Sequence, residues 1–530
     1  MGDSLAGTFT LVRLGLRRDR WLLPLWIAAF ALMAYSTAAA SSGLFPDERS
    51  RIEAATTLNS TASMVALFGR IYDPSSLGAL AMIKYSGFMT AALAVLMVFI
   101  TIRHTRQDEE TGRLELLSSG RLGRNAPLAA ALVISFGASI VLGLLTSVGL
   151  IAGGLSVSGS LAFGLGWAAT GIAFSSVAAV TAQISSSSRS AIGLGVIVVV
   201  VAYVLRAVGD LAEPGPSALS WLSPIGWNQQ VRAYAGDRWE VLLLPVALGV
   251  ALIPLAAVLR AHRDLGTGLR QDRPGRARGN LAGVWGLAIR LQNRVFLAWA
   301  IAVVAFGLLI GSLADSVTDF LTSPNAQELI EKLGGAGFLT DAFLAAEIAI
   351  MGIVVAVYGV SAANHLRSEE TAGHTEVMLA TAKTRTKWAS SHYVVALVGV
   401  AVLMVLTGLS VGVGAAYALG DSSQIGRVTI AALAQIPATW VVASVVMLLF
   451  GWVPRLTYAA WGVFLAFVAL GEFGVLWNAP QWLMDLSPFQ HSPLLPVGTS
   501  GITPLVWLTF AAAAATVVGY IGWQRRDVTD

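Results

Sequence analysis

Two segments of this 530-residue chain carry charged residues in the same order and at the same spacing. HTRQDEETGRLELLSSGRLGR occupies positions 104–124, HLRSEETAGHTEVMLATAKTR occupies 365–385, and the two align without gaps at an offset of 261 residues. The identical pairs are His104/His365, Arg106/Arg367, Glu109/Glu370, Gly112/Gly373, Glu115/Glu376 and Arg124/Arg385. A repeat at fixed spacing indicates two copies of one structural unit.

The shared pattern R-x-[DE]-E-x-x-G-x-x-E is suited to ion pairing and docking. On a helix, Arg106 lies one turn from Glu109, and Gly112 lies one turn from Glu115. The apolar residues that follow, such as Leu116, supply an apolar edge. The pattern therefore predicts a short amphipathic helix that docks against another protein.

A second interpretation is that each segment is only a charged helix end that keeps the neighbouring span in register. Basic residues are expected at such ends, whereas acids contribute little to orientation. We prefer this interpretation for Arg103, Arg121 and Arg124. For the acids and glycines that recur at identical spacing, docking is the better explanation.

The residue types do not favour a catalytic, metal or nucleotide site. The chain has no cysteine and only six scattered histidines, so no thiolate site, paired-carboxylate site or metal cluster is apparent. It lacks the G-x-x-x-x-G-K-[ST] motif and contains no Gly-Lys pair, so it has no P-loop for ATP. We expect no cofactor in this chain. If transport uses ATP, another polypeptide must bind the nucleotide and its Mg²⁺.

The elements that position these loops are predicted to lie in a membrane. Hydrophobic residues make up 56% of the chain and charged residues 12%, about half the share in soluble proteins. This excludes a soluble enzyme and a nucleic-acid-binding protein. A bilayer needs roughly 20 apolar residues per helix. About twelve such stretches occur, at 21–42, 80–102, 127–152, 159–183, 190–212, 240–260, 295–315, 341–363, 390–416, 428–450, 456–477 and 502–523.

Arginine and lysine set the expected orientation. With the N-terminus inside, 25 of the 34 basic residues fall on cytoplasmic segments, so we expect a multi-pass protein of the bacterial plasma membrane with both termini in the cytoplasm. The arginine-rich stretch 261–289 has no apolar periodicity and is predicted to be a linker. It separates two six-span domains, 1–260 and 290–530. The fold class is therefore all-α, with two parallel six-helix repeats.

Ionisable residues inside predicted spans mark a possible gate. Lys84 lies in the second span and Glu347 in the eighth, and the repeat offset brings their positions within two residues of each other. Such residues are costly in a bilayer and are functional candidates. The alternative is that both side chains extend to the outer interface. Arg206 and Asp210 are four residues apart and predict a local ion pair.

The charged loop after the second of six spans resembles that of the permease subunits of type-2 ABC exporters, where it contains the coupling helix that touches the ATPase. The whole chain resembles the double-length actinobacterial permeases of polyketide-antibiotic and multidrug exporters, the tetronasin-resistance type. The resemblance implies that two copies of a separate ATPase bind. One would engage Arg106, Glu109, Gly112 and Glu115, and the other Arg367, Glu370, Gly373 and Glu376. Thr371 stands where the first loop has Glu110, so the two contacts need not be equivalent.

The resemblance also implies a substrate route along spans one, two, five, seven, eight and eleven. Apolar side chains there suit a hydrophobic drug, antibiotic or lipid-like molecule. They are Phe30, Tyr35, Phe88, Met89, Phe99, Phe306, Met351, Tyr358, Phe464 and Phe467. Individually, aromatic residues in spans usually serve packing. Two other functions stay open: a proton-coupled secondary transporter of 6+6 layout, and a membrane enzyme such as a lipid glycosyltransferase.

Overall fold

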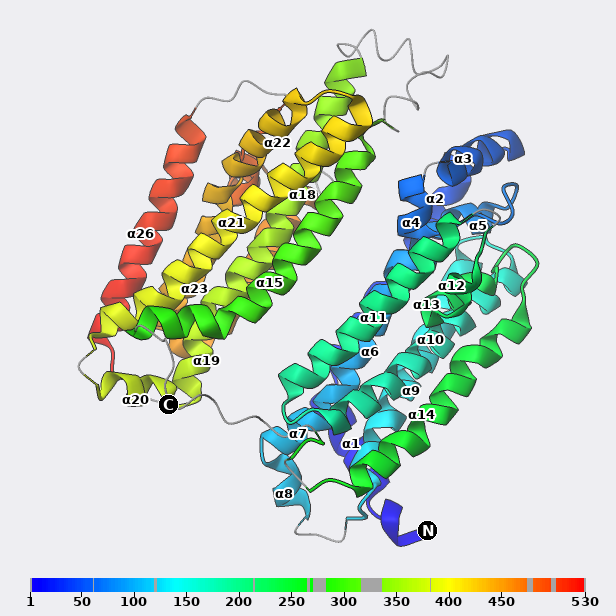
Figure 1. Ribbon diagram of the computed structural model, residues 1–530, viewed down its shortest axis with the longest axis horizontal. Helices are drawn as coiled ribbons and strands as arrows, with labels where there is room; N and C mark the ends of the chain where they lie inside the picture. Colours follow the sequence, from blue (N-terminus) through cyan, green and yellow to red (C-terminus); the bar gives the residue numbers. More distant parts are fainter. Residues whose placement is uncertain are drawn as a thin grey trace. The chain divides into compact units, whose positions relative to one another are not determined.

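The computed structural model describes most of the chain. The described residues are 2–60, 62–118, 122–212, 215–264, 267–269, 283–315, 336–381, 383–473, 480–496 and 502–528. They form helices joined by turns, with no strand among them. The chain divides into two compact units, Met1–Gly275 and Arg276–Asp530, and the division falls inside the predicted linker 261–289 (Figure 1). Each unit is described by itself below.

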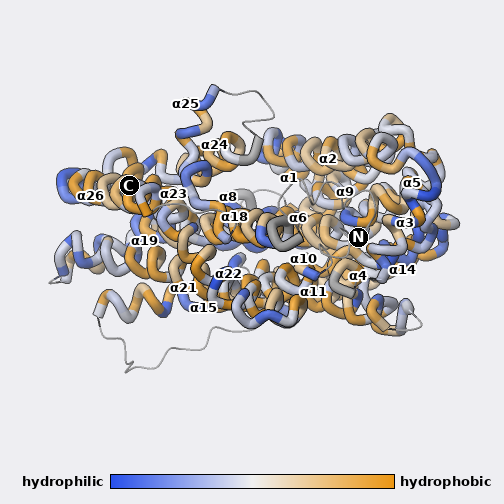
Figure 2. Tube along the Cα trace, turned by 90° about the horizontal axis from the view of Figure 1, so that it is seen from above, coloured by the Kyte–Doolittle hydropathy of each residue, from blue (hydrophilic) through white to orange (hydrophobic). Residues whose placement is uncertain are grey.

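Twelve described helices are long and apolar enough to cross a membrane, which confirms the predicted number of spans and makes this an all-α polytopic membrane protein. Helices dominate because lipid offers no hydrogen-bond partners, so each backbone amide and carbonyl must be paired within its own segment. Hydrophobic residues run along most of the long helices (Figure 2).

Six spans belong to the first unit. They are α2 (Leu22–Leu44), the π-helical turn η2 with α6 (Tyr85–Met89, Thr90–Arg103), α9 (Ala126–Ala152), α10 (Val157–Ile184), α11 (Ser188–Leu211) and η3 with α14 (Trp239–Leu242, Leu243–Ala261). The amphipathic helix α1 (Thr8–Arg18) precedes them, after the short turn η1 (Gly2–Leu5). Helix α10 is the central element, because it packs against α6, α9, α11 and α14.

The other six spans belong to the second unit. They are α15 (Gly283–Ser312), α18 (Ala336–Ala363), α21 (Arg385–Leu419), α22 with α23 (Ser423–Ala434, Ile436–Trp452), η4 with α24 (Pro454–Ala459, Ala460–Phe473) and α26 (Thr503–Arg525). Helix α15 begins at Gly283, whereas hydropathy predicted a start at 295. Hydropathy detects only the apolar part of a helix, and the polar residues before that part are also helical.

Small residues allow close packing of α9 on α10. A methyl group added at Gly143 would overlap the carbonyl oxygen of Gly164, and one added at Gly164 would overlap that of Gly143. Gly451 and Gly519 play a similar part between α23 and α26. Membrane helices gain van der Waals contact in this way, since lipid supplies no hydrophobic driving force between them.

Short helices connect the spans at the ends that we predict to be extracellular. In the first unit they are α3 (Glu48–Ser60), α4 (Ala62–Phe68), α5 (Leu77–Ala81), α12 (Ala218–Trp221) and α13 (Pro224–Gln230). In the second they are α25 (Gln481–Met484) and η5 (Pro488–His491). The second unit's loop over 316–335 lies outside the described residues.

The buried hydroxyl groups of Ser223 and Ser487 make matching contacts. Ser223 donates to the carbonyl of Ala202 at 2.6 Å, and Ser487 donates to that of Phe467 at 2.7 Å. Each serine thereby ties the segment before the last span of its unit to the span that precedes it. Each serine precedes a proline, in Ser223-Pro224 and Ser487-Pro488, and has the same structural role in both units.

Candidate functional site

The first repeated loop forms two short helices, α7 (Arg106–Glu110) and α8 (Arg113–Ser118). Gly112 lies between them with a φ of +71°. This left-handed conformation is costly for residues with a Cβ atom, so glycine suits the sharp turn. The loop continues directly from α6 and so is fixed to the second span.

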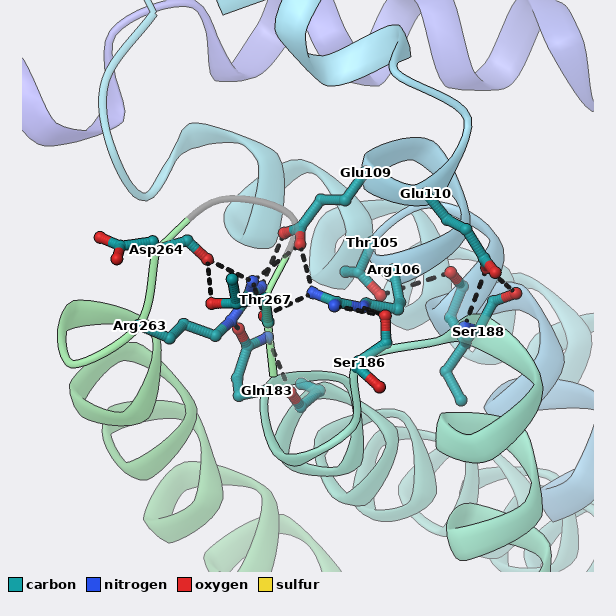
Figure 3. Close-up of polar contacts among 12 residues, drawn as sticks. Thr105, Arg106, Glu109, Glu110, Gln183, Ser186, Ser188, Arg263, Asp264 and Thr267 are labelled. Carbon is teal, nitrogen blue, oxygen red and sulfur yellow. Dashed lines mark hydrogen bonds and ion pairs between the residues drawn. The ribbon is translucent and has the colours of Figure 1, made fainter. Parts of the chain in front are cut away.

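A buried ion cluster holds α7 in place (Figure 3). Arg106 Nη1 lies 2.7 Å from Glu109 Oε2, and Arg263 Nη2 lies 2.7 Å from Glu109 Oε1. Arg263 Nη1 adds a hydrogen bond of 2.8 Å to Glu109 Oε2. The three side chains are at most 3% exposed. Because Arg263 follows α14, the cluster connects the second span to the end of the sixth.

The same cluster reaches the turn between α10 and α11. Arg106 Nε donates to the carbonyl of Ser186 at 3.0 Å, and Glu110 accepts from the amide of Ser188 at 3.0 Å. Arg263 Nε donates to the side chain of Gln183 at 2.8 Å. The loop is therefore attached to spans two, four, five and six of its unit.

The second repeated loop has the same construction. Helices α19 (His365–Thr371) and α20 (His374–Leu379) flank Gly373, whose φ is +74°. Arg367 Nη1 lies 2.8 Å from Glu370 Oε2, and Arg526 Nη2 lies 2.7 Å from Glu370 Oε1. Burial lowers the pKa of the Arg526 guanidinium, and the neighbouring Glu370 carboxylate opposes that shift.

Two further arginines also match between the units. Arg124 Nη2 donates to the carbonyl of Ala261 at 2.7 Å, and Arg385 Nη1 donates to that of Arg526 at 2.6 Å. We interpreted Arg124 from the sequence as an orientation signal. The structure gives it a bond that fastens the end of the sixth span to the beginning of the third.

The eight predicted coupling residues fall into two groups. Those in the first helix of each loop face inward: the exposed fraction of the whole residue, backbone included, is 1% for Arg106, 8% for Glu109, 8% for Arg367 and 7% for Glu370. In the second helix of each loop, Glu115 and Glu376 are exposed. Their repeat-matched neighbours Leu116 and Val377 are 79% and 70% exposed. Among the charged residues of the two groups, only Glu115 and Glu376 are exposed to solvent.

Sequence reasoning missed Arg263 and Arg526, which it assigned to the linker and the C-terminal tail. They are 263 residues apart, so they fall out of the 261-residue register of the loops. The available signal was an arginine directly after the last span of each half. Asp19 was missed as well: its buried carboxylate lies 3.0 Å from Arg103 Nη2 and 2.7 Å from His104 Nε2.

The other predicted residues are distributed over both units. Lys84 is exposed at the start of η2, and Glu347 is half-buried in α18. They lie in different units, so their pairing stays a prediction. The expected ion pair inside α11 is confirmed, since Arg206 Nη1 lies 3.6 Å from Asp210 Oδ2.

Three of the five first-unit members of the predicted substrate route, Phe30, Phe88 and Phe99, border a cavity. It has a volume of about 500 Å³ and lies between α2, α6 and α11. Its wall includes Trp26, Phe30, Phe88, Phe99 and Tyr203. Met89 is half-buried, and Tyr35 is 41% exposed outside this wall.

The second-unit members are packed into the core. Met351, Tyr358 and Phe464 are at most 5% exposed, and Phe306 and Phe467 pack against the same core. The Tyr358 ring lies 6.1 Å from both Phe296 and Trp299. These side chains have a packing role in the structure.

Comparison with known proteins gives two matches. The family described as "Multidrug efflux system permease Rv1217c, C-terminal domain" matches residues 9–263 and 281–524. The chain is also similar to the multidrug efflux system permease protein Rv1217c of Mycobacterium tuberculosis. The two are 40% identical over 532 aligned positions, which cover 99% of this chain and 96% of that protein.

Proposed function

Because the chain belongs to the family of multidrug efflux permeases, we propose that it is the membrane-spanning subunit of an ATP-driven, type-2 ABC exporter. It moves a hydrophobic drug, antibiotic or lipid-like compound out of the cytoplasm or the inner leaflet. Two copies of a separate ATPase bind ATP and Mg²⁺. The double-length, 6+6 organisation gives one docking loop to each copy.

The observation that carries this proposal is the repeated loop with an outward face and a buried anchor. In each unit an exposed acid is followed by an exposed aliphatic residue, Glu115–Leu116 or Glu376–Val377. The preceding helix is fixed by an arginine–glutamate–arginine cluster. An apolar residue on a rigid base loses little entropy when a partner covers it, which favours docking.

The contacts of the first loop suggest how a push on α8 reaches the membrane. Helix α7 is continuous with α6 and is bonded to the start of α11 through Ser186 and Ser188. Helices α6 and α11 both line the apolar cavity of about 500 Å³. Movement of the loop therefore shifts two walls of the cavity together. Arg106, Glu109, Arg367 and Glu370 act as positioning residues, and Glu115 and Glu376 as contact residues.

The cavity suits a hydrophobic substrate. Its wall is made of aromatic and aliphatic side chains, and apolar sites with few polar groups bind by area rather than by specific hydrogen bonds. Lys84 and Glu347 remain our candidates for an outer gate. The proposal includes a bacterial plasma membrane location with both termini in the cytoplasm, supported by the distribution of basic residues.

Transport measured in proteoliposomes tests the proposal. The chain is reconstituted with and without a separate ABC ATPase, and export of a fluorescent hydrophobic dye is followed. We expect transport to require ATP and to stop when the Walker lysine of the ATPase is replaced by alanine. Transport that continues without any ATPase and stops when a protonophore removes the proton gradient would instead identify the secondary transporter.

A further inference from the structure

A basic pocket lies next to the first loop and shares Arg124 and Arg263 with the contacts that hold the loop. It has a volume of about 320 Å³ and lies between the end of α14, the beginning of α9 and helix α8. Its lining consists of Leu114, Leu122, Gly123, Arg124, Pro127, Arg260, Arg263 and Asp264. Three of these eight residues carry a guanidinium group.

Arg260 is the unusual member of this lining. It is only 7% exposed, yet its guanidinium makes no hydrogen bond or ion pair with any residue of the described ranges. A buried charge without a partner is strongly unfavourable. Arginine does not lose its proton in proteins, so a bound anion would stabilise this guanidinium.

The neighbouring side chains that the structure describes do not form a direct ion pair with the Arg260 guanidinium. The Glu109 carboxylate interacts electrostatically with Arg260, but it forms its direct ion pairs with Arg106 and Arg263. Arg124 uses one Nη for the carbonyl of Ala261. Asp264 is the one acidic residue in the lining, and in Figure 3 its carboxylate points away from Glu109 and Arg263. Two further sources of positive potential are the Arg263 side chain and the N-terminal end of α9, which begins at the pocket.

The second unit has no guanidinium group at the corresponding position. Arg260 lies three residues before the cluster arginine Arg263, and Trp523 lies three residues before the cluster arginine Arg526. The two positions therefore correspond. Trp523 is fully buried, donates to the carbonyl of Arg385 at 3.1 Å and packs against Phe450 at 5.0 Å. The indole supplies packing where the first unit has an unpaired cation. The pocket is thus a property of the first unit and does not follow from the repeat.

We propose that this pocket binds the phosphate group of an anionic phospholipid. Guanidinium groups hold phosphate oxygens with two parallel hydrogen bonds, and basic pockets between spanning helices are suited to lipid headgroups. The pocket lies where two spans end, and Leu114, Leu122 and Pro127 supply an apolar side for the glycerol and first methylenes. Its place in the inner leaflet depends on the proposed orientation, whereas the binding itself depends only on the pocket.

Thermal unfolding of the purified full-length chain tests the proposal without the ATPase or any transport. The probes are detergent micelles containing phosphatidylglycerol, the same micelles with phosphatidylcholine, and inorganic phosphate alone. The variants are Arg260→Met, Arg260→Lys and, as a control, Arg189→Met, which removes an exposed arginine outside the pocket. We expect phosphatidylglycerol to raise the Tm of the wild type and of Arg189→Met by several degrees more than phosphatidylcholine does.

The Arg260 variants decide between the outcomes. We expect Arg260→Met to lose the extra shift while keeping its Tm in lipid-free detergent, and Arg260→Lys to keep part of the shift. An equal phosphatidylglycerol shift in Arg260→Met and the wild type would overturn the proposal. A full shift with inorganic phosphate alone would overturn the lipid as the source. A separate assay of ATPase binding covers the remaining outcome. If Arg260→Met weakens ATPase binding but leaves the phosphatidylglycerol shift in Tm unchanged, a partner protein fills the pocket instead of a lipid.

Discussion

The two units keep one ion cluster and differ in several of the contacts that surround it. Arg106–Glu109–Arg263 and Arg367–Glu370–Arg526 join a loop to the end of the sixth span of their unit with nearly equal distances. The glycines between the two short helices have φ values within 3° of each other. The part that is the same in both units is the attachment of the loop.

The surrounding contacts show how each unit stabilises that attachment. The first unit adds the charged groups Asp19, which binds Arg103 and His104, and Glu110, which binds Ser188. In the second unit, Thr371 stands at the position of Glu110. Gln292 stands at the position of Asp19 when Arg17 and Trp26 are aligned with Arg290 and Trp299. The second unit adds aromatic packing, since Arg526 lies over the rings of Phe450 and Trp523 at 4.8 and 4.6 Å. The first loop is held mainly by charge, and the second partly by aromatic contacts.

Removal of the central carboxylate provides the strongest test of this difference. Glu109→Ala removes the carboxylate that two buried arginines share, and breaking a buried pair costs about 3–5 kcal/mol. We expect a smaller loss for Glu370→Ala, because Arg526 keeps its aromatic contacts. SDS-induced unfolding followed by tryptophan fluorescence measures both variants. Glu53→Ala, which breaks an exposed pair with Arg49, should cost about 0–1 kcal/mol. Equal losses for Glu109→Ala and Glu370→Ala would remove the proposed contrast.

The spans were predictable and the clusters were only partly so. A run of about 20 apolar residues strongly indicates a spanning helix, because a helix of that length matches the thickness of the bilayer core. The Arg106–Glu109 spacing indicated a pair, but the same spacing occurs on exposed and buried helices, so it carried no information on burial. Arg263 and Arg526 bind glutamates that lie 154 and 156 residues earlier in the chain. Contacts over such separations depend on how the helices pack, which local patterns do not encode.

Replacement of Asp19 tests the charged contacts of the first unit. Asp19→Asn removes the charge that faces Arg103 and His104, and hydrogen bonds to charged groups contribute about 1.5–3 kcal/mol. We expect a loss of stability in that range by the same SDS assay. Gln292→Leu is the matched change in the second unit and should cost about 1 kcal/mol or less, since the side-chain amide makes one hydrogen bond within the described residues, 3.4 Å long. A larger loss for Gln292→Leu would contradict the contrast.

The exposed faces of the loops test whether the units remain equivalent toward the ATPase. Leu116→Asp and Val377→Asp each place a charge where an apolar contact is proposed, and each should weaken ATPase binding about tenfold, or about 1.4 kcal/mol. Neither should lower the Tm, because both side chains are largely exposed. Leu222→Asp changes a leucine that is 66% exposed on the predicted outer side and should leave binding unchanged. A defect in only one of the two loop variants would mean that a single loop dominates docking.

The smallest expected effect concerns the turn that both loops share. An alanine Cβ at Gly112 or Gly373 would meet no atom within 4 Å, so the cost is only that of a positive φ, about 1 kcal/mol. Gly420→Ala is a matched control, because Gly420 has a φ of +66°, open space around it and a place at the end of α21, away from the loops. We expect similar losses of stability in all three variants, but reduced stimulation of ATP hydrolysis only in Gly112→Ala and Gly373→Ala. If Gly420→Ala reduced stimulation as much, the turn would matter for general stability, and the angle between the two short helices would have no specific part in coupling.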